Sequence, residues 1–328
     1  MSTICFNVRG SNGGGGPVTF VFKTAKELTR MGHKVIYDSP QKANAAICII
    51  ETGKFLRYCA KSKTKVILRI DGIYNDEYNK KFNRAIRPDM AALHAKLMTD
   101  IPAVHHMVYQ SNWSKDRIDD EIIKRKDNNW CIINNGVDTN LFKPTNITSS
   151  TKLRLVHVGL MRNGYIMECL MGAYDELKRR GHDVSITMVG SMDGECQKVY
   201  SKYKGDSNII HKPKVANSLL PSLYGSGDIY LGPRQGSSSD NVIAEAQACG
   251  LPVVIPSWGG NSDMVVDKST GIVVPSGHWD YDAKYHCALA DGVEDISKDL
   301  VGYKSRARNH ATQSLTIGKM VDKYLKIL

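Results

Sequence analysis

The sequence predicts an α/β fold built from two doubly wound domains. Apolar segments of strand length alternate with segments of helical length along the 328 residues, and this alternation restarts after a polar stretch at residues 145–152. Each half opens with a strand, a glycine-containing loop, a helix that ends in Gly-His, and a second strand. Such a unit begins a doubly wound sheet, in which ligands bind at the carboxyl ends of the parallel strands.

In the first half, a strand at 4–8 is followed by the loop RGSNGGGG and a helix over 18–31. Further strands are predicted at 34–37, 45–50, 65–70, 107–110 and 130–133. The consecutive glycines 13–16 let the backbone approach a ligand closely. They fit a dinucleotide fingerprint only loosely, and Asp38 is the one acidic candidate after the second strand. The signal for a nicotinamide cofactor is therefore weak.

The second half repeats the alternation. Strands are predicted at 153–158, 184–189, 208–211 and 228–231, and helices at 167–180, 195–204 and 219–224. The segment 237–254, SSSDNVIAEAQACGLPVV, then predicts a short helix and a buried strand. Gly250 is suited to the left-handed conformation that ends a helix, and Pro252 prevents its continuation.

The start of this short helix is a candidate anion site. Ser239, Asp240 and Asn241 are candidates to cap it, and free N–H groups and the helix dipole both favour negative charge there. Glu245 lies about 6 Å further along the helix axis. That offset suits a ribose attached to a diphosphate held at the helix tip. The alternative is that Glu245 is an ordinary solvated helix residue.

Composition limits the classes of protein. The chain is 42% hydrophobic and 23% charged, which is typical of a globular protein. No apolar run reaches transmembrane length, and residues 1–6 lead directly into the glycine loop, so no signal peptide is expected. The eight cysteines are scattered without a C-x-x-C pair, which predicts reduced thiols in a cytoplasmic protein.

The net charge of +11 leaves four interpretations open: a solvated basic surface, an anionic donor, an acidic acceptor, or peripheral contact with an anionic membrane. No arginine-rich run or aromatic–basic repeat is present, so no nucleic acid partner is expected. The sequence does not predict an oligomeric state.

Three segments carry a resemblance to a known family. The run 245–254, EAQACGLPVV, resembles the donor-binding helix of family-4 retaining glycosyltransferases, whose motif is Glu, seven residues, Glu, then Ala-x-Ala-x-Gly-x-Pro-Val. The segments 30–37 and 135–144 are similar to the end of the first β-α-β unit and the end of the first domain in that family. The resemblance extends over nearly the whole chain, and it suggests a short, divergent member of the family, of the kind encoded by large algal DNA viruses.

The resemblance implies the GT-B fold, with two Rossmann-like domains and a cleft between them. It places an acceptor-side domain at 1–148, a donor-side domain at 149–306, and a C-terminal helix at 307–328 that returns to the first domain. It also assigns donor-binding roles. Glu245 would hold the ribose, and Ser237 stands where the family has a sugar-contacting glutamate. The remaining donor-helix residues are Ser238, Ser239 and Asn241, and the glycine loop, including Gly15 and Gly16, would face the donor phosphate and the acceptor.

A diphosphate leaving group requires cations or dipoles. Leu160 occupies the position of the family's usual arginine, and the usual lysine is absent, so Arg162 is the predicted phosphate ligand, with Arg234 in reserve. The alternative for Arg162 is a surface arginine. The backbone N–H groups of Gly259 and Gly260 would contact phosphate or a sugar hydroxyl.

The base is expected against Lys212–Val215, with Val215 as its contact. Asp193 and Glu195 could together accept from guanine, which favours a GDP-linked donor, or they could cap the following helix. Asp71 replaces a family histidine that contacts the transferred sugar, and it could bind a hydroxyl or support positive charge at the anomeric carbon. The alternative for Asp71 is a turn residue before Gly72.

The predicted function is therefore retaining transfer of a hexose to a glycan, glycoprotein or lipid acceptor, with no cofactor besides the nucleotide-sugar substrate. No metal-binding motif is present, so catalysis is expected to be independent of metal. The rivals are a nucleotide-sugar epimerase, which would need paired carboxylates, a non-catalytic nucleotide-sugar-binding protein, and a dehydrogenase, which would bind NAD.

Overall fold

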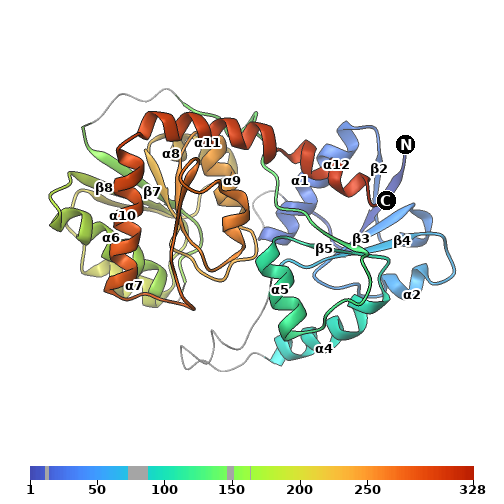
Figure 1. The fold of residues 1–328 in the computed structure, drawn as a ribbon. Helices are drawn as coiled ribbons and strands as arrows, with labels where there is room; N and C mark the ends of the chain where they lie inside the picture. Colours follow the sequence, from blue (N-terminus) through green and yellow to red (C-terminus); the bar gives the residue numbers. More distant parts are fainter. Residues whose placement is uncertain (12–14, 73–87, 146–150, 163) are drawn as a thin grey trace. The chain divides into compact units, whose positions relative to one another are not determined.

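The computed structural model describes residues 1–11, 15–72, 88–145, 151–162 and 164–328, which form two compact units (Figure 1). Unit 1 comprises Met1–Gly136 and Ile317–Leu328, and unit 2 comprises Val137–Thr316. Each unit holds one six-stranded sheet, and the predicted pair of doubly wound α/β domains is confirmed. The units change over after residues 136 and 316, whereas the sequence analysis placed domain changes after residues 148 and 306.

Unit 1 is built on a parallel sheet in the order β2-β1-β3-β4-β5-β6. The strands are β1 (Thr3–Phe6), β2 (Lys34–Tyr37), β3 (Ala45–Ile49), β4 (Lys65–Arg69), β5 (His106–Tyr109) and β6 (Trp130–Ile132). The helices are α1 (Gly16–Arg30), α2 (Phe55–Cys59), α4 (Pro88–Ala103), α5 (Asn112–Glu121) and α12 (Ile317–Leu325), with the 3-10 turn η1 (Pro40–Lys42). The strand order reverses between β1 and β3, so the topological switch point lies at the carboxyl end of β1.

Local sequence explains these elements. Strand β3, AAICI, is buried along its whole length, as expected for a parallel sheet with both faces covered. Gly32 takes a φ of +85° after α1, where a left-handed residue ends the helix. Helix α12 packs against α1, and Phe20 and Tyr324 meet there with ring centroids 5.7 Å apart.

Unit 2 is built on a parallel sheet in the order β12-β11-β10-β7-β8-β9. The strands are β7 (Leu153–Val158), β8 (Val184–Val189), β9 (Ile209–Lys212), β10 (Ile229–Leu231), β11 (Val253–Pro256) and β12 (Gly271–Val274). The helices are α6 (Tyr165–Arg179), α7 (Gly194–Ser201), α8 (Leu220–Gly225), α9 (Asn241–Ala248), α10 (Ala283–Ser297) and α11 (Leu300–Ser314), with the 3-10 turns η2 (Asn217–Leu219) and η3 (Gly260–Met264). Here the switch point lies between β7 and β10.

The predicted single helix over 307–328 is wrong, because the segment forms the end of α11 and the separate helix α12. The break follows from a tertiary contact. The N–H of Val137 donates to the carbonyl of Leu315 at 2.8 Å, and Val137 forms a β-bridge with Thr316. The side chain of Leu315 is buried in the core of unit 2, so the chain leaves the helix there without a glycine or proline.

The eight cysteines are unpaired, and burial raises the pKa of thiols such as Cys48 and Cys169 well above the usual value. Inert, protonated thiols of this kind act as small apolar core residues. Among the helices that the structure describes, none has the length and apolarity needed to cross a membrane.

Candidate functional site

At the switch point of unit 2, two side-chain hydrogen bonds connect the ends of β7 and β10. The pairing of β7 with β10 ends at Val156 and Tyr230. Beyond it, the Nδ1 of His157 lies 2.9 Å from the carbonyl oxygen of Leu231, and the hydroxyl of Tyr230 donates to the carbonyl of Val158 at 3.1 Å. A carbonyl only accepts, so Nδ1 carries the hydrogen. Burial lowers the pKa of His157 to about 4, and the imidazole is neutral at pH 7.

Helix α9 follows β10 after a loop at residues 232–240. The three serines before it, Ser237, Ser238 and Ser239, are each less than one-tenth exposed. Asp240 is the N-cap residue, but its side chain does not cap the helix. Its N–H instead donates to Asn261 at 2.7 Å, and the Asn261 amide donates back to the Asp240 carboxylate at 3.0 Å. The first-turn N–H groups of α9 therefore receive no capping side chain, as an anion site requires.

The loop after β11 packs against the serines. Gly260 donates its N–H to the carbonyl of Ser237 at 2.6 Å, and Gly236 donates to the carbonyl of Trp258 at 3.0 Å. Gly259 has a φ of +142°, and a Cβ there would lie 3.3 Å from the backbone nitrogens of Gly236 and Ser237. The positive φ favours glycine at this position, and the close backbone leaves little room for a side chain. The predicted residues Gly259, Gly260 and Ser237 are thus brought together.

Glu245 is a buried carboxylate and not a solvated helix residue. Glu245 lies one turn from the start of α9 and is 5% exposed. The hydroxyl of Tyr224, on α8, donates to its Oε2 at 3.2 Å. Burial, followed by the nearby charge of Glu245, raises the pKa of Tyr224 well above its usual value, so the hydroxyl remains a donor. Such a donor lowers the cost of burying a polar group.

The two candidate arginines flank the switch point. Arg162 is exposed in the loop after β7, and this loop is held by a β-bridge between Met161 and Met192. Arg234 follows β10, and its side chain is 51% exposed and 3.7 Å from the carboxylate of Asp240. Both residues follow strands at the carboxyl-end edge of the sheet, where ligands bind in open α/β sheets.

In the predicted base-binding region, the structure shows the role of one residue, Asp193. Asp193 accepts from the N–H of Cys196 at 2.9 Å and is the N-cap of α7, as its alternative interpretation held. Glu195 is exposed in the first turn of the same helix. Val215 is partly buried against the core of unit 2.

The candidates Gly15, Gly16 and Asp71 belong to unit 1. Gly15 is the N-cap residue of α1, and a Cβ on Gly16, the first residue of the helix, would meet nothing within 4 Å. Among the described residues, none therefore crowds the backbone at this helix start. Gly13 and Gly14 lie outside the described residues.

Asp71 lies in a buried polar network. It forms an ion pair with Arg69, which is 1% exposed, and Gln110 donates to its Oδ1 at 3.1 Å. Arg69 also donates to Asn135 at 2.7 Å, and its guanidinium lies 3.8 Å from the ring centroid of Phe20. Burial lowers the pKa of Arg69 to about 10. Asp71 thus balances a buried cation, while its Oδ2 accepts no hydrogen bond from the described residues.

Three residues that shape the site were missed by sequence reasoning: Tyr224, Asn261 and His157. Each acts on a residue far away in sequence, for example across 21 positions between Tyr224 and Glu245. Only His157 carried a local signal, because a polar residue interrupts the apolar run of β7.

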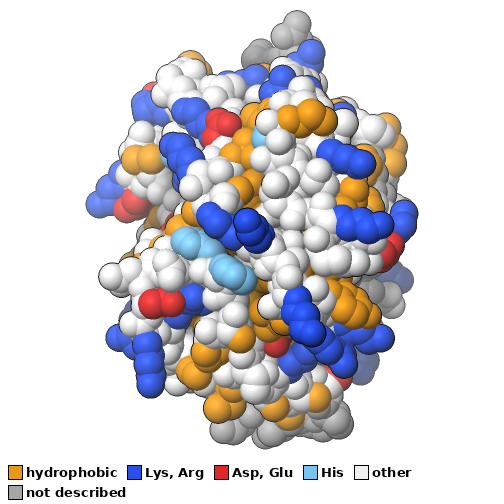
Figure 2. All heavy atoms as spheres, turned by 90° about the vertical axis from the view of Figure 1, so that its right-hand side faces the viewer, with side chains coloured by type: hydrophobic (Ala, Val, Ile, Leu, Met, Phe, Trp, Pro, Cys, Tyr) orange, Lys and Arg blue, Asp and Glu red, His pale blue; other side chains and the backbone are white. Residues whose placement is uncertain are grey.

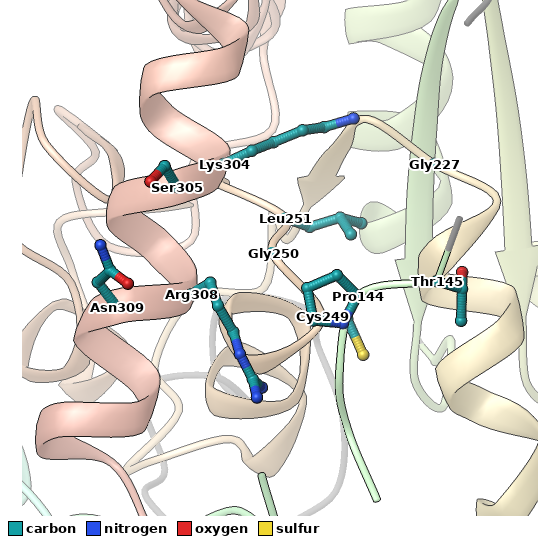
Figure 3. A pocket seen from close by; sticks show the side chains of 10 residues that line it. All are labelled: Pro144, Thr145, Gly227, Cys249, Gly250, Leu251, Lys304, Ser305, Arg308 and Asn309. Carbon is teal, nitrogen blue, oxygen red and sulfur yellow. The ribbon is translucent and has the colours of Figure 1, made fainter. Parts of the chain in front are cut away.

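A separate pocket of about 300 Å³ lies in unit 2 beyond the C-terminal end of α9 (Figure 3). Its two cations are already engaged. Lys304 is 2.7 Å from Asp228, and Arg308 donates to the carbonyls of Ala248 at 2.6 Å and Phe142 at 2.9 Å. The pocket therefore offers no unsatisfied charge to a phosphate. Within the described residues, no cluster of three or more His, Cys, Asp or Glu side chains could hold a metal ion.

Comparison with known proteins finds a family match for part of the chain and a shared fold for the whole of it. Residues 152–299 match the family model described as Glycosyl transferases group 1. The whole chain has the fold of GT-B glycosyltransferases, which confirms the expected fold class. The matched residues 152–299 include the switch point of unit 2, α9 and the loop around Gly259.

Individual relatives are similar over different lengths. A D-inositol 3-phosphate glycosyltransferase of Paenarthrobacter aurescens (strain TC1) is 29% identical over 197 residues, which are 56% of this chain and 47% of that protein. The chain spans about half the length, or less, of such curated relatives. Sucrose-phosphate synthase from Thermosynechococcus elongatus is superposed with a TM-score of 0.80 at 14% identity, covering 100% of this chain and 98% of that one. Anabaena Alr3699/HepE in complex with UDP and glucose gives a TM-score of 0.71 at 14% identity, covering 99% of each chain.

Proposed function

We propose that this protein is a glycosyltransferase that moves a hexose from a nucleoside-diphosphate sugar to a glycan, glycoprotein or lipid acceptor. One observation carries the proposal: a buried carboxylate, Glu245, is held by Tyr224 one turn inside a helix whose uncapped N-terminus follows the switch-point strand. The matched segment 152–299 contains this helix. The names of the relatives, and the UDP and glucose bound to one structural neighbour, support the same substrate class.

The donor would be bound piece by piece along this edge. The diphosphate would lie at the N-terminus of α9, against Ser238, Ser239 and Asn241, because the helix dipole and first-turn N–H groups that the Asp240 side chain does not cap favour an anion there. Arg162 would add a planar, charged donor. The backbone of Gly259 would contact phosphate or sugar, Ser237 the sugar, Glu245 the ribose, and Val215 the base. The N–H of Gly260 already donates to the carbonyl of Ser237, so Gly260 would position this loop and not bind the phosphate as the sequence predicted.

We propose transfer with retention of configuration and without a metal. The bond from the anomeric carbon to the diphosphate breaks, and the acceptor oxygen bonds to the same face of that carbon. The acceptor proton goes to the leaving phosphate oxygen, so no protein nucleophile is required. Arg162 and the helix dipole would stabilise the charge that develops on the diphosphate. Asp71, which pairs with Arg69, would support the positive charge that develops at the anomeric carbon.

We propose a GDP-linked donor in preference to a UDP-linked one. Asp193 caps α7, and Glu195, exposed in the first turn of that helix, is the carboxylate that would accept from guanine N1–H and N2–H. The unpaired cysteines are consistent with a cytoplasmic protein, which is the location we propose.

The test is a calorimetric titration with GDP, UDP and their hexose conjugates, followed by NMR assignment of the anomer released or transferred. We expect binding that survives excess chelator, slow release of free sugar, and a product with the donor's anomeric configuration. Absence of nucleotide binding would reject the proposal. Tight binding without turnover would favour the non-catalytic alternative, and loss of binding in chelator that magnesium restores would reject metal independence.

A further inference from the structure

The net charge of the chain is concentrated in one unit. Unit 1 contains 25 Lys and Arg against 14 Asp and Glu, a net charge of +11, whereas unit 2 contains 19 of each and is neutral. The unit that we propose binds the anionic donor is therefore the neutral one. The positive charge of unit 1 requires a different explanation.

Within unit 1, lysines gather at the edge of the sheet where the strands begin. We call the segments 31–34, 40–44, 60–65 and 104–106, which lead into β2, β3, β4 and β5, the basic edge. These segments contain five lysines, three histidines and no aspartate or glutamate. The lysines, all exposed, are Lys34, Lys42, Lys61, Lys63 and Lys65. Figure 2 shows the side of the molecule on which β1 begins, with Lys and Arg spread over it and few acidic side chains.

Hydrogen bonds hold these segments together as one surface. The hydroxyl of Thr64 donates to the carbonyls of Pro40 at 3.0 Å and Ala43 at 2.8 Å, which ties 60–65 to 40–44. The N–H of Val66 donates to Nδ1 of His105 at 3.1 Å, which ties 104–106 to β4. Three strand spacings separate β2 from β4, so the lysines extend over about 14 Å.

The same edge of unit 2 provides an internal comparison. There the cations have acidic partners: Lys152 lies 3.4 Å from Asp183, and Arg154 and Lys304 lie 2.9 and 2.7 Å from Asp228. In the described part of the chain, none of the five lysines of the basic edge forms an ion pair. Uncompensated like charges repel one another, so the arrangement is unfavourable unless an external anion lies against it.

The position of the basic edge excludes a role in the proposed transfer. Ligands bind at the carboxyl ends of the strands, and β3 and β4 are each five residues long, so the basic edge lies about 16 Å from that end. The cations are all lysines, which are point charges without the planar fork that recognises a single phosphate. Spread-out point charges suit a surface that carries many anions.

We propose that the basic edge of unit 1 docks on an anionic membrane surface, with its lysines among the lipid phosphates. Helix α2 packs on η1 and β4 and so lies beside the basic edge. Its Tyr58, 48% exposed, supplies an aromatic side chain of the kind that lies at headgroup level. The docking is electrostatic and reversible, and it weakens as salt screens the lysines. The proposal is independent of the transferase activity.

The experiment is sedimentation of the full chain with phosphatidylcholine vesicles, with and without phosphatidylglycerol. We expect binding only to the anionic vesicles and its loss in high salt. Each basic residue near such a surface strengthens binding by about fivefold. The triple variant Lys61→Gln/Lys63→Gln/Lys65→Gln should therefore bind about a hundredfold more weakly. The matched control is Lys198→Gln/Lys202→Gln/Lys204→Gln, which removes three exposed lysines from unit 2 and should bind like the parent.

Three results would overturn the proposal: equal losses in both triple variants, binding to neutral vesicles that salt does not affect, or tight binding to heparin or DNA without vesicle binding. Melting temperature distinguishes a loss of docking from misfolding, since all variants should melt at the temperature of the parent. Nucleotide affinity separates this proposal from the proposed function, because the edge variant should bind nucleotide normally even where vesicle binding is lost.

Discussion

At the residue scale, the acid inside α9 is the strongest indication of function. A carboxylate that is 5% exposed costs free energy to desolvate, and the hydroxyl of Tyr224 orients it. We propose that the hydroxyls of a ribose donate to this acid. Its burial and its place one turn inside α9 fit that role.

We predict that Glu245→Ala weakens nucleoside diphosphate binding tenfold to a hundredfold, because a hydrogen bond to a charged group contributes about 1.5–3 kcal/mol. Calorimetry measures the change. The control is Gln247→Ala, which removes another fully buried polar side chain of α9, one that donates to the carbonyl of Met264 at 2.8 Å. Similar affinity losses in both variants would indicate a general disturbance of the helix and not a ribose contact.

We predict that Tyr224→Phe lowers nucleotide affinity severalfold, because Glu245 loses the donor that orients it. The matched control is Tyr230→Phe, which removes an equally buried hydroxyl bonded to Val158. Each variant should lose about 1 kcal/mol of unfolding free energy. Only Tyr224→Phe should lower nucleotide affinity. It should leave unchanged the affinity for a nucleotide whose ribose lacks hydroxyls. If that deoxy analogue also bound more weakly to Tyr224→Phe, the tyrosine would not act through the ribose.

Arg162→Ala should reduce affinity for the nucleoside diphosphate far more than for the free nucleoside, because charge-assisted bonds to phosphate are lost. The dependence of binding on salt should also become flatter. Arg234→Ala is the comparison, because Arg234 already lies 3.7 Å from Asp240. A large effect at Arg234 alone would show that the wrong arginine was assigned to the diphosphate.

At the scale of elements, the sequence predicted what local signals determine. The end of α9 is an example: Gly250 has a φ of +80°, its N–H bonds to the carbonyl of Gln247 at 2.9 Å, and that of Leu251 bonds to Ala246 at 2.9 Å. Strand β2 was predicted at its observed bounds. The bond from Tyr224 to Glu245 and the break at Leu315 depend on contacts between distant segments, which no single-sequence pattern encodes. Helices α4, α5 and α10 were also not predicted.

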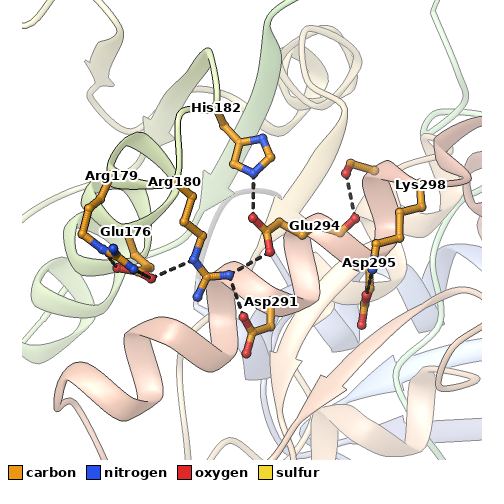
Figure 4. A network of polar contacts seen from close by, with 9 residues as sticks. Glu176, Arg179, Arg180, His182, Asp291, Glu294, Asp295 and Lys298 are labelled. Carbon is orange, nitrogen blue, oxygen red and sulfur yellow. Dashed lines mark hydrogen bonds and ion pairs between the residues drawn. The ribbon is translucent and has the colours of Figure 1, made fainter.

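Helices α6 and α10 are joined by an ion-pair network (Figure 4). Hydrogen bonds from Arg179 and Arg180 lower the pKa of Glu176 to about 2. Burial raises the pKa of Glu294, but hydrogen bonds from His182 and Arg180 outweigh burial and hold it below the usual value. The network therefore stabilises the fold in its ionised form.

We predict that unit 2 loses stability as the pH falls from about 4.3 to about 2. A carboxylate with a lowered folded pKa stabilises above its unfolded pKa, and this contribution disappears as it is protonated on descent through the folded value. Melting temperature against pH should fall less steeply in Glu176→Gln. The control, Asp295→Asn, breaks an exposed pair with Lys298 and should keep the parent slope. An unchanged slope in Glu176→Gln would contradict the assignment.

At the scale of the molecule, the two units divide charge and chemistry between them. The proposed phosphate and ribose ligands, Arg162 and Glu245, lie in neutral unit 2, and the basic edge lies in unit 1. Each unit also has its own buried clusters around its own sheet. Ligand binding to one unit and surface binding to the other are therefore separable by mutation.

This division predicts how the chain unfolds with ligand. Calorimetry should show two transitions, and nucleoside diphosphate should raise only that of unit 2, because a ligand stabilises the unit that binds it. At a concentration a hundredfold above Kd the gain is about 2.7 kcal/mol, or about 5–10 °C for a domain of this size. Glu176→Gln identifies the transition of unit 2 by lowering it alone, and Arg162→Ala should abolish most of the shift. If nucleotide raised the transition of unit 1 instead, the assignment of the donor site to α9 would be wrong.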